Sequence, residues 1–346
     1  MRPEVEKVGN KAMNETWKEE ILKKWNKDKS PVMIKDSVRD RLSREFKGEI
    51  FYKEPMNKHT TIRIGGPADV FLRPSGLDDL TAALRIAREE NIPFMVLGAG
   101  SNTLVKDGGI RGFVITPGKA LMDCRVVRES ELEADVEAGA GVGITAFVNF
   151  TRDSSLTGAE PLVGIPGTVG GAIVMNAGAR GREIKDIVRE ITVLTKELEI
   201  VKIPREKLEF EYRNLKIPRS HVVTGGLFRL SKGNAEEIAE NVRNYKKKRV
   251  ETQPLQCPNL GSVFKNPQAR KKGEMPLYAA QLIDEAGLKN VRVGGARISE
   301  KHANFIVNEN NAKAEDVIIL IGLIRDKIKE TTGVVLETEV KIVGED

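Results

Sequence analysis

The sequence predicts a mixed α/β protein that folds as two or three subdomains. The chain has 346 residues, which is more than one hydrophobic core usually serves. From Glu54 onward, stretches with helical periodicity alternate with short stretches that are typical of strands. The hydrophobic fraction of 40% and the charged fraction of 31% are those of an ordinary globular protein.

The first 50 residues differ from the rest and predict an accessory helical arm. One apolar stripe at helical spacing runs from Trp17 to Trp25 through Ile21, and a second consists of Val38, Leu42 and Phe46. Both stripes lie between strongly charged residues. We expect such an arm to pack on the body of the protein or on a second subunit, and a membrane-surface or partner-binding arm is the alternative.

The elements after the arm follow from apolar periodicity and from turn residues. Residues 77–91 carry an apolar face at helical spacing and predict an amphipathic helix. Pro93 begins a short buried strand that leads into a Gly-rich turn. Strict alternation over 131–138 predicts a half-buried strand whose apolar face holds Leu132, Ala134, Val136 and Ala138.

A helix and a strand are predicted at the C-terminal end. Val317, Leu320, Ile324 and Ile328 mark a strong helical stripe, with two carboxylates in its first turn. A Thr-Gly pair at 332–333 stops this helix. The residues from Val334 to Val343 then predict a strand.

Composition and charge narrow the classes of function. The formal net charge of +6 and the pI near 9.1 suit an anionic ligand. The basic residues are spread among carboxylates, so nucleic-acid binding is the weaker interpretation. Cys124, Cys257 and three histidines show no metal-ligand spacing, which predicts no metal site and a reducing compartment. No apolar stretch is long enough to span a bilayer and no signal peptide is evident, so we expect a cytoplasmic protein.

Three Gly-rich segments dominate the first half of the chain, at 63–69, 97–112 and 164–184. Glycine permits positive φ and a close approach of backbone N–H groups, which can bind a pyrophosphate. The Walker pattern is absent, and the turn at 98–103 lacks the third glycine of the Rossmann fingerprint. A tight turn without ligand is the alternative for each loop alone. Together they predict a large phosphate-bearing cofactor in a setting other than a Rossmann fold.

Seven stretches resemble one enzyme family and occur in that family's order. They are HTTIRIGGPAD, LGAGSNTLVKDGGIRGFVI, GAEPLVGIPGTVGGAIVMNAGARGREI, FEYRN, QPLQCPNLGSVFKNP, LIDEAGLKNVRVGGARISEKHANFIVN and LETEVKIVG. In them the chain resembles the UDP-N-acetylmuramate dehydrogenases, also called UDP-N-acetylenolpyruvoylglucosamine reductases, over about residues 54–344. The resemblance is to the shorter class, because no insertion between Pro218 and Gly233 carries the extra substrate-covering loop.

The resemblance implies a fold and its division. The fold is α/β (α+β), with a vanillyl-alcohol-oxidase-type FAD-binding domain of two subdomains and a third α+β subdomain for the substrate. The expected bounds are 1–50 for the arm, 51–118 and 119–233 for the FAD-binding subdomains, and 234–333 for the substrate subdomain. The C-terminal strand, 334–346, is expected to complete the first FAD-binding subdomain.

The resemblance also implies a reaction. NADPH would reduce FAD, and the reduced flavin would convert the enolpyruvyl compound UDP-N-acetyl-3-O-(1-carboxyvinyl)-glucosamine to UDP-N-acetylmuramate for peptidoglycan synthesis. The partner is then a small UDP-sugar, with no nucleic acid, no membrane and no metal, and the protein is expected to be a monomer or a weak homo-oligomer. Two alternatives remain open: another FAD oxidoreductase of the same fold with a different substrate, and a non-enzymatic nucleotide- or nucleic-acid-binding protein.

Three residues match the catalytic positions of the family. Ser262, in GSVFKNP, matches the proton donor, although a serine in a turn often only caps a backbone amide. Arg213, in FEYRN, matches the arginine that binds the enolpyruvyl carboxylate, and a surface ion pair with Glu209 or Glu211 is the alternative. Glu339 matches the catalytic glutamate, which needs a raised pKa to donate a hydrogen bond.

The resemblance implies two further sets of contacts. The residues expected around the FAD are Gly98, Gly100, Ser101, Asn102, Ile165, Pro166, Gly167, Thr168, Gly170, Asn176, Gly178 and Ala179. The residues expected near the UDP-sugar are Tyr212, Arg249, Gln253, Lys265, Asn266 and His302. Among the latter, Tyr212 could equally be a packing residue, and His302 could be a partly buried histidine with an ordinary hydrogen bond.

Overall fold

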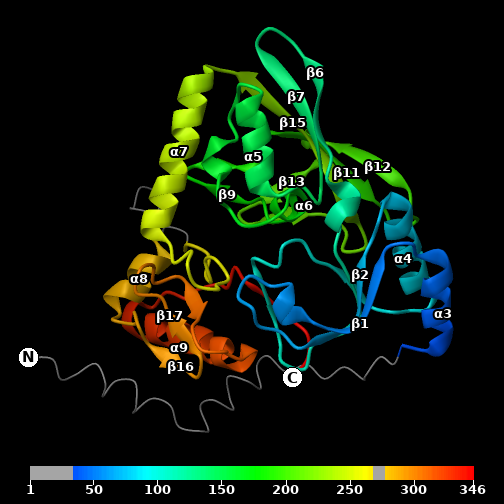
Figure 1. The fold of residues 1–346 in the computed structure, drawn as a ribbon. Helices are drawn as coiled ribbons and strands as arrows, with labels where there is room; N and C mark the ends of the chain where they lie inside the picture. Colours follow the sequence, from blue (N-terminus) through cyan, green and yellow to red (C-terminus); the bar gives the residue numbers. More distant parts are fainter. Residues whose placement is uncertain (1–33, 268–276) are drawn as a thin grey trace, which may run out of the picture.

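The computed structural model describes residues 34–267 and 277–346, which form three packed units (Figure 1). The first and second units are α/β and lie next to each other, and the third, smaller unit lies below the second. The stripe predicted from Trp17 to Trp25 lies outside the described residues. In the described part of the chain, no helix combines the length and apolar character that crossing a membrane requires.

The first unit is a mixed sheet covered by two helices. Its strand order is β1-β2-β5-β3, with β1 antiparallel to β2 and the other pairs parallel. The elements are α3 (Asp36–Glu45), β1 (Glu49–Pro55), β2 (Pro67–Arg73), α4 (Leu77–Glu89), β3 (Phe94–Val96) and β5 (Ile110–Ile115). The predicted helix at 77–91 and the strand after Pro93 are therefore confirmed. Val38, Leu42 and Phe46 are buried in this unit's core, so this part of the predicted arm packs on the body.

The second unit is an antiparallel sheet with helices on its core side. Its strand order is β12-β11-β15-β7-β6, and β8 pairs with β15. The elements are β6 (Cys124–Glu129), β7 (Glu133–Gly139), α5 (Ile144–Asp153), β8 (Leu156–Thr157), α6 (Val169–Val174), β11 (Val188–Leu194), β12 (Ile200–Pro204) and β15 (Val222–Lys232). Two small hairpins extend it, β9 (Gly178–Ala179) with β10 (Arg182–Glu183) and β13 (Glu209–Glu211) with β14 (Asn214–Lys216).

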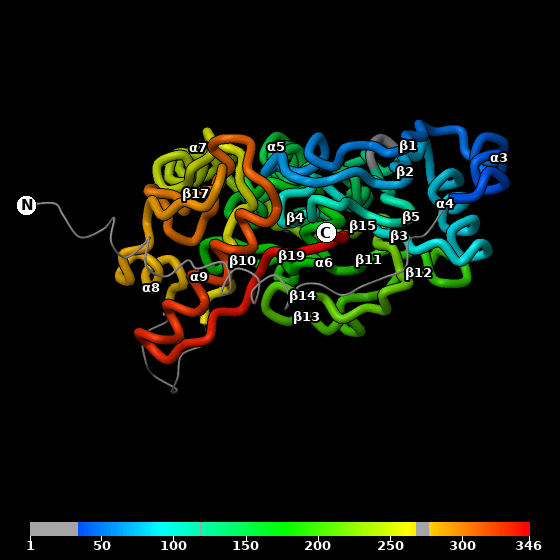
Figure 2. Tube along the Cα trace, turned by 90° about the horizontal axis from the view of Figure 1, so that it is seen from below, coloured from blue at the N-terminus to red at the C-terminus, as the bar shows by residue number. Residues whose placement is uncertain are grey.

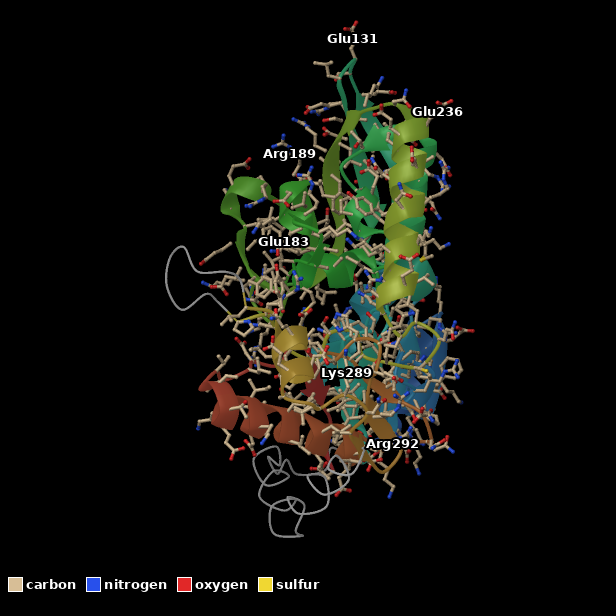
Figure 3. The ribbon with its side chains drawn as sticks, turned by 90° about the vertical axis from the view of Figure 1, so that its left-hand side faces the viewer. Glu131, Glu183, Arg189, Glu236, Lys289 and Arg292 are labelled. Atoms are coloured by element: carbon tan, nitrogen blue, oxygen red, sulfur yellow. The ribbon has the colours of Figure 1, made fainter. Side chains whose placement is uncertain are left out.

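The strand predicted over 131–138 is present as β7, but one of its inward residues is not buried. Ala134, Val136 and Ala138 belong to the core, whereas Leu132 is 77% exposed. Leu132 precedes the strand, in the turn of the β6–β7 hairpin, next to Glu131 at the projecting tip in Figure 3. The strand predicted from residue 131 therefore begins two residues later, at Glu133.

Helix α7 (Ala235–Thr252) runs along the second unit, not within the third (Figure 1). Val242 is buried in the second unit's core, and Tyr245 packs against the same core. The third unit comprises α8 (Ala279–Glu285), β16 (Arg292–Val293), β17 (Ala296–Ile298), β18 (Ile306–Asn308) and α9 (Ala314–Thr332). Its boundary in the structure thus follows α7, later than the predicted start at Asn234.

The C-terminal segment joins the third unit back to the first. Helix α9 ends at Gly333, whose φ is +69°, as the Thr-Gly signal predicts. Only β19 (Lys341–Val343) forms a strand, parallel to β4 (Thr103–Val105), and the two lie side by side in Figure 2. The strand predicted from Val334 is therefore wrong over most of its length, because the backbone at 336–340 pairs with a loop of the third unit.

The loop that follows β4 also holds the third unit in place. The carboxylate of Asp107 accepts hydrogen bonds from Ala314 N at 3.1 Å and Glu315 N at 3.2 Å, at the start of α9. Lys106, nearly buried, forms an ion pair with Asp346. The Gly-rich loop of the first unit is thus fixed to both the third unit and the C-terminus.

Candidate active site

Two Gly-rich loops from different units meet at the centre of the molecule. Ser101 Oγ, from the first unit, donates a 2.6 Å hydrogen bond to the carbonyl of Pro166, from the second. A Cβ atom on Gly98 would lie 2.8 Å from Thr168 Oγ1, so the loops approach as closely as glycine allows. The structure therefore brings Gly98 and Ser101 together with Pro166 and Thr168, as the resemblance implies.

Positive φ values explain why glycine occupies these loops. Gly100 has φ of +61°, and a Cβ atom there would lie 2.1 Å from the carbonyl oxygen of His59. Gly167 has φ of +151°, and its nearest neighbour to an added Cβ is Ser101 Oγ at 3.6 Å. The backbone at Gly167 is thus open on one side, which suits the approach of a phosphate-bearing group.

A cavity of about 320 Å³ adjoins the first loop. Its lining combines backbone of the Gly-rich turn with basic, hydroxyl and aromatic side chains: Lys58, His59, Thr60, Thr61, Phe71, Arg73, Leu97, Gly98, Ala99 and Thr116. The ring of His59 stacks on Phe71 at 4.0 Å between centroids. Flat rings, hydroxyls and an arginine suit a nucleotide, so the cavity and the two loops together fit FAD.

Most residues of this cavity were missed by the sequence analysis. HTTIRIGGPAD contributed to the resemblance, but no cofactor contact was predicted in it. His59 and Thr60 precede a Gly-rich turn, and that position is the signal that could have identified them. Phe71 and Arg73 lie on β2, where alternation predicts only a core strand and its exposed face.

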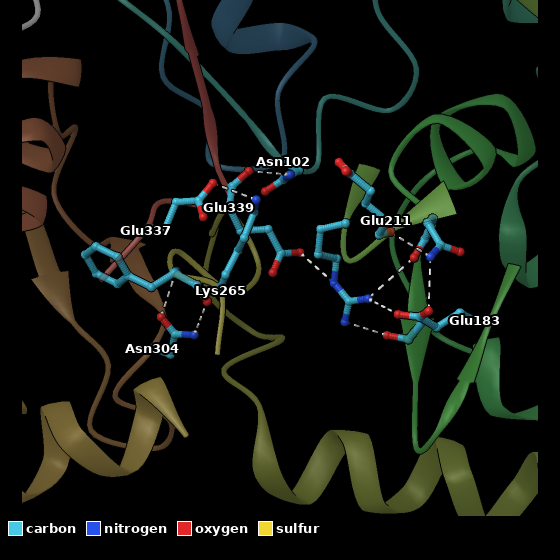
Figure 4. Close-up of polar contacts among 11 residues, drawn as sticks. Asn102, Glu183, Glu211, Lys265, Asn304, Glu337 and Glu339 are labelled. Carbon is cyan, nitrogen blue, oxygen red and sulfur yellow. Dashed lines mark hydrogen bonds and ion pairs between the residues drawn. The ribbon is translucent and has the colours of Figure 1, made fainter. Parts of the chain in front are cut away.

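Some residues predicted around the FAD make contacts within the protein instead. An added Cβ on Gly170 would lie 2.7 Å from Ala140 Cβ, which indicates a packing role. Ile165 packs against the second unit's core. Asn102 Nδ2 donates to the carbonyl of Glu339 at 3.1 Å, linking the first loop to the C-terminal segment (Figure 4). Their flavin contacts stay predictions.

Arg213 lies between two carboxylates. Its Nε is 3.3 Å from Glu339 Oε1 and its Nη1 is 3.2 Å from Glu183 Oε1, and Figure 4 shows these carboxylates on opposite sides of the guanidinium. Arg213 has φ of +59°, a left-handed conformation that costs a non-glycine residue roughly 1–2 kcal/mol. The expected alternative, an ion pair with Glu209 or Glu211, does not form: both carboxylates pair with Lys216.

Several residues of the Gly-rich segment at 164–184 contact Arg213. Its Nη1 and Nη2 donate to the carbonyls of Asn176 and Gly178 at 3.4 and 3.2 Å. The Asn176 side chain is fully buried and donates to Glu183 and to the carbonyl of Glu211. Asn176 and Gly178 therefore support the arginine, and the flavin contacts expected of these two residues and of Ala179 stay predictions.

Ser262 reaches the same region through a short backbone ladder. The carbonyl of Val263 accepts a 2.8 Å hydrogen bond from Glu339 N, and Lys265 N donates to the carbonyl of Glu337 at 2.9 Å. The segment that begins at the half-buried Ser262 thus lies against the segment that carries Glu339. The structure brings all three predicted catalytic positions into one region from distant parts of the chain.

Burial raises the pKa of the Glu339 carboxyl above its ordinary value, although nearby Arg213 and Lys265 oppose the shift. Its side chain is 17% exposed. A carboxyl group in this setting keeps its proton to a higher pH and can then donate a hydrogen bond. Glu339 therefore has the property that the predicted role requires.

The predicted substrate residues near Arg213 have different roles in the structure. Tyr212 is 41% exposed, and its ring lies 4.6 Å from the guanidinium carbon of Arg213, a cation–π contact. Lys265 Nζ is 2.7 Å from Glu337 Oε1. Asn266 Oδ1 accepts a hydrogen bond from Ala279 N, at the start of α8. Asn266 thus supports a helix, while Tyr212 and Lys265 lie beside the catalytic positions.

The other predicted substrate residues share a feature: each has a buried polar atom without a hydrogen-bond partner among residues 34–267 and 277–346. These atoms are Arg249 Nε, Gln253 Oε1 and His302 Nδ1. Burial lowers the pKa of Arg249 to about 10, and Arg180 adds a repulsive positive charge. Within the described part of the chain, no carboxylate forms an ion pair with Arg249 or Arg180. Two neighbouring cations and unsatisfied polar atoms are what an anionic, hydrogen-bonding ligand would complete.

No cluster of three or more His, Cys, Asp or Glu side chains suited to a metal ion occurs in the described part of the chain.

Comparison with known proteins agrees with this geometry. The FAD binding domain family matches residues 68–203. The family described as UDP-N-acetylenolpyruvoylglucosamine reductase, C-terminal domain, matches residues 253–343. The second match begins directly after α7 (Ala235–Thr252), where the packing also places the start of the third unit.

Full-length relatives and a solved structure extend the likeness over most of the chain. UDP-N-acetylenolpyruvoylglucosamine reductase of Geobacter metallireducens is 42% identical over 313 residues, 90% of this chain and 100% of that protein. The protein of that name from Syntrophus aciditrophicus is 41% identical over 316 residues, 91% and 99% of the chains. The crystal structure of the Thermus caldophilus reductase covers 86% of this chain and 98% of its own, with 32% identity and a TM-score of 0.71. The chain therefore belongs to the UDP-N-acetylenolpyruvoylglucosamine reductase family of FAD-dependent oxidoreductases.

Proposed function

We propose that Arg213, Ser262 and Glu339 carry out the reduction of the enolpyruvyl group in this chain, with NADPH as the ultimate reductant. The observation that carries the proposal is the 3.3 Å ion pair between Arg213 and Glu339, which come from distant parts of the sequence. Ser262 lies on the segment that pairs with Glu339. An arginine, a neutral carboxyl and a hydroxyl are the groups that protonation next to a carboxylate needs.

FAD, held by the loops of Gly98 and Gly167, would supply the hydride for C3 of the enolpyruvyl group after reduction by NADPH. Arg213 binds the substrate carboxylate through its fork of donors and balances the negative charge that develops there. The protonated carboxyl of Glu339 donates a hydrogen bond to the same carboxylate. Ser262 Oγ delivers the proton to C2, and the charge of Lys265, three residues later in the same segment, favours loss of that proton. One hydride and one proton together saturate the double bond.

Arg249, Gln253 and His302 are proposed to hold the UDP part of the substrate. Their unsatisfied polar atoms and the facing charge of Arg180 support this assignment. A diphosphate would offset the repulsion between the two arginines. The residues that would hold FAD are those of the loops of Gly98 and Gly167 and those that line the cavity beside His59.

The two half-reactions, measured separately, test the proposed roles. The purified holoenzyme is first bleached anaerobically with NADPH and then mixed with the enolpyruvyl UDP-sugar. We expect Ser262→Ala to leave the first step intact and to slow the second strongly. Reoxidation by oxygen alone, in the unaltered enzyme, would instead support a different flavin enzyme of the same fold.

The setting of the reaction is also a proposal. The two cysteines, Cys124 and Cys257, are free thiols, which suits a reducing, cytoplasmic compartment. We propose that the working form is a monomer or a weak homo-oligomer, since a single chain brings together all the catalytic positions. The anionic ligand is proposed to be the UDP-sugar and not a nucleic acid, because the half-buried Arg249 lies against Gly164 of the Gly-rich segment and close to Arg180.

A further inference from the structure

Glu183 faces Arg213 from the side opposite Glu339 (Figure 4). Its Oε1 lies 3.2 Å from Arg213 Nη1. Its Oε2 accepts a 3.0 Å hydrogen bond from Asn176 Nδ2 and lies 2.6 Å from Lys185 Nζ. Two donors besides the arginine, Asn176 and Lys185, therefore hold this carboxylate against Arg213.

The backbone around Glu183 permits this close placement. Glu183 pairs with Gly178 across the β9–β10 hairpin, and an added Cβ on Gly178 would lie 2.7 Å from Glu183 Cγ. Glu183 N donates a 2.7 Å hydrogen bond to Asp186 Oδ2, which fixes the turn that follows. Asn176, the second donor to Glu183, is fully buried with φ of +40°. Glycine at 178 and the turn after 183 thus keep the carboxylate in one position.

The charges of this group become unbalanced when the substrate enters. Before binding, one guanidinium serves the carboxylates of Glu183 and Glu339. The substrate brings a third carboxylate to the same guanidinium. The other cations nearby are already paired, Lys185 with Glu183 and Lys265 with Glu337. Three ionised carboxylates around one arginine repel each other strongly, so binding favours uptake of a proton.

Glu339 is the member of the group that can change. Its carboxylate contacts Arg213 from a segment that crosses between two units, whereas Glu183 is also held by Asn176 and Lys185. We propose that Glu183 is a positioning residue: it anchors Arg213 so that the entering substrate carboxylate displaces Glu339, and Glu339 takes up the proton. This inference rests on the proposed function and adds to it the origin of the proton on Glu339.

The sign of each perturbation follows from the charges that face Glu339. These are Arg213 from the β13–β14 hairpin, Lys265 from the Ser262 segment and Lys341 from its own segment. Arg213 in turn contacts Glu183, and Glu183 contacts Lys185. Without the negative charge of Glu183, the positive charge of Arg213 acts on Glu339 alone. The ionised form of Glu339 is then favoured. Removing the positive charge of Lys185 has the opposite effect.

The remaining carboxylates nearby are engaged elsewhere. Glu337 pairs with Lys265, and Glu211 pairs with Lys216 on the exposed side of its hairpin. Neither lies between Arg213 and the substrate carboxylate in the proposed arrangement. Glu211→Gln is therefore a matched control: it removes one negative charge from the hairpin that carries Arg213 without changing the contact between Arg213 and Glu183.

The experiment measures the second half-reaction of holoenzyme against pH for Glu183→Gln, Lys185→Ala and Glu211→Gln. In each pH–rate profile, the fall in rate at high pH (the basic limb) reports the loss of the Glu339 proton. We expect this limb to move down by about one pH unit in Glu183→Gln and up by a smaller amount in Lys185→Ala. The Glu211→Gln limb should stay close to that of the unaltered enzyme. A purely structural effect of the substitutions would lower rates without moving the limbs in opposite directions.

Proton uptake provides a readout besides activity. Substrate is titrated into the oxidised holoenzyme in two buffers of different ionisation enthalpy. We expect about one proton to be taken up above the pKa of Glu339 in the free enzyme, and no uptake in Glu339→Gln. Unchanged uptake in Glu339→Gln, or limbs of Glu183→Gln and Lys185→Ala that coincide, would overturn the inference. Should Glu183→Gln fail to fold, the upward shift in Lys185→Ala, whose side chain is 38% exposed, still decides the question.

The proposed function fails differently. If it is wrong, the unaltered reduced enzyme is not reoxidised by the enolpyruvyl UDP-sugar at any pH. If only the present inference is wrong, the unaltered enzyme turns over and the charge variants share its pH profile.

Discussion

Replacing Arg213 by lysine is expected to slow the transfer to substrate while sparing the reduction of the flavin. The guanidinium reaches Glu339 through Nε and Glu183 through Nη1, and it donates to the carbonyl of Gly178 through Nη2. A lysine ammonium keeps the charge but not the planar fork. Both residues pay the same penalty for the left-handed backbone at 213, so that strain does not differ between them.

The magnitude follows from the donors lost. A lysine can anchor on Glu183 or bind the substrate carboxylate, but it cannot span both as the arginine does. One charge-assisted hydrogen bond to a carboxylate contributes about 1.5–3 kcal/mol. That corresponds to a loss of about 10- to 150-fold in kcat/KM for the enolpyruvyl substrate. The loss should appear in KM and kcat together, because the carboxylate carries charge both before and during the reaction.

The assay is anaerobic stopped-flow spectroscopy of the flavin in each half-reaction. Reduction by NADPH should change by less than about threefold, which corresponds to under 1 kcal/mol. Arg229→Lys is the matched control: Arg229 also makes a two-donor contact, with Asp135 in the second sheet, and it should leave both half-reactions unchanged. An equal loss in both half-reactions of Arg213→Lys, or no loss in the second, would refute the assigned role.

Three further substitutions follow from the same geometry. Ser262→Ala should slow only the second half-reaction, by about 10²–10⁴-fold; equal slowing of flavin reduction would indicate a structural serine. Burial raises the pKa of Glu339, so the wild-type rate should fall as pH rises through that value, and Glu339→Gln should lack this limb; pH profiles that coincide would contradict the role. Asp107→Ala removes two hydrogen bonds at the start of α9 and should lower the free energy of unfolding by about 0.5–2 kcal/mol in denaturant titrations; an unchanged value would mean that the contact contributes nothing.

Periodic segments were predictable because local sequence determines them. The apolar face of α4 and the Gly333 stop of α9 need no partner to be recognised. The strand expected from Val334 fails for a non-local reason. Its backbone pairs first with Val263 in one unit and then with Asn102 in another, and a segment that changes partners cannot keep one ladder. Alternation alone does not contain that information.

In the candidate site too, some features could be predicted from the sequence and others could not. Family motifs identified Arg213, Ser262 and Glu339, but not what holds them. Glu183 lies within a motif that was read for its glycines, and its contact with Arg213 depends on the folding of a hairpin far along the chain. The packing of α7 could not be predicted either. The apolar residues Val242 and Tyr245 indicate that the helix has a buried side, but they do not indicate which unit covers it.

The structure of the oxidised holoenzyme with the enolpyruvyl UDP-sugar bound tests the central claim most directly. We predict the substrate carboxylate within hydrogen-bond distance of both Arg213 and Glu339, with Ser262 Oγ facing C2 and the diphosphate near Arg249. A carboxylate bound elsewhere, with Ser262 remote from C2, would contradict the account.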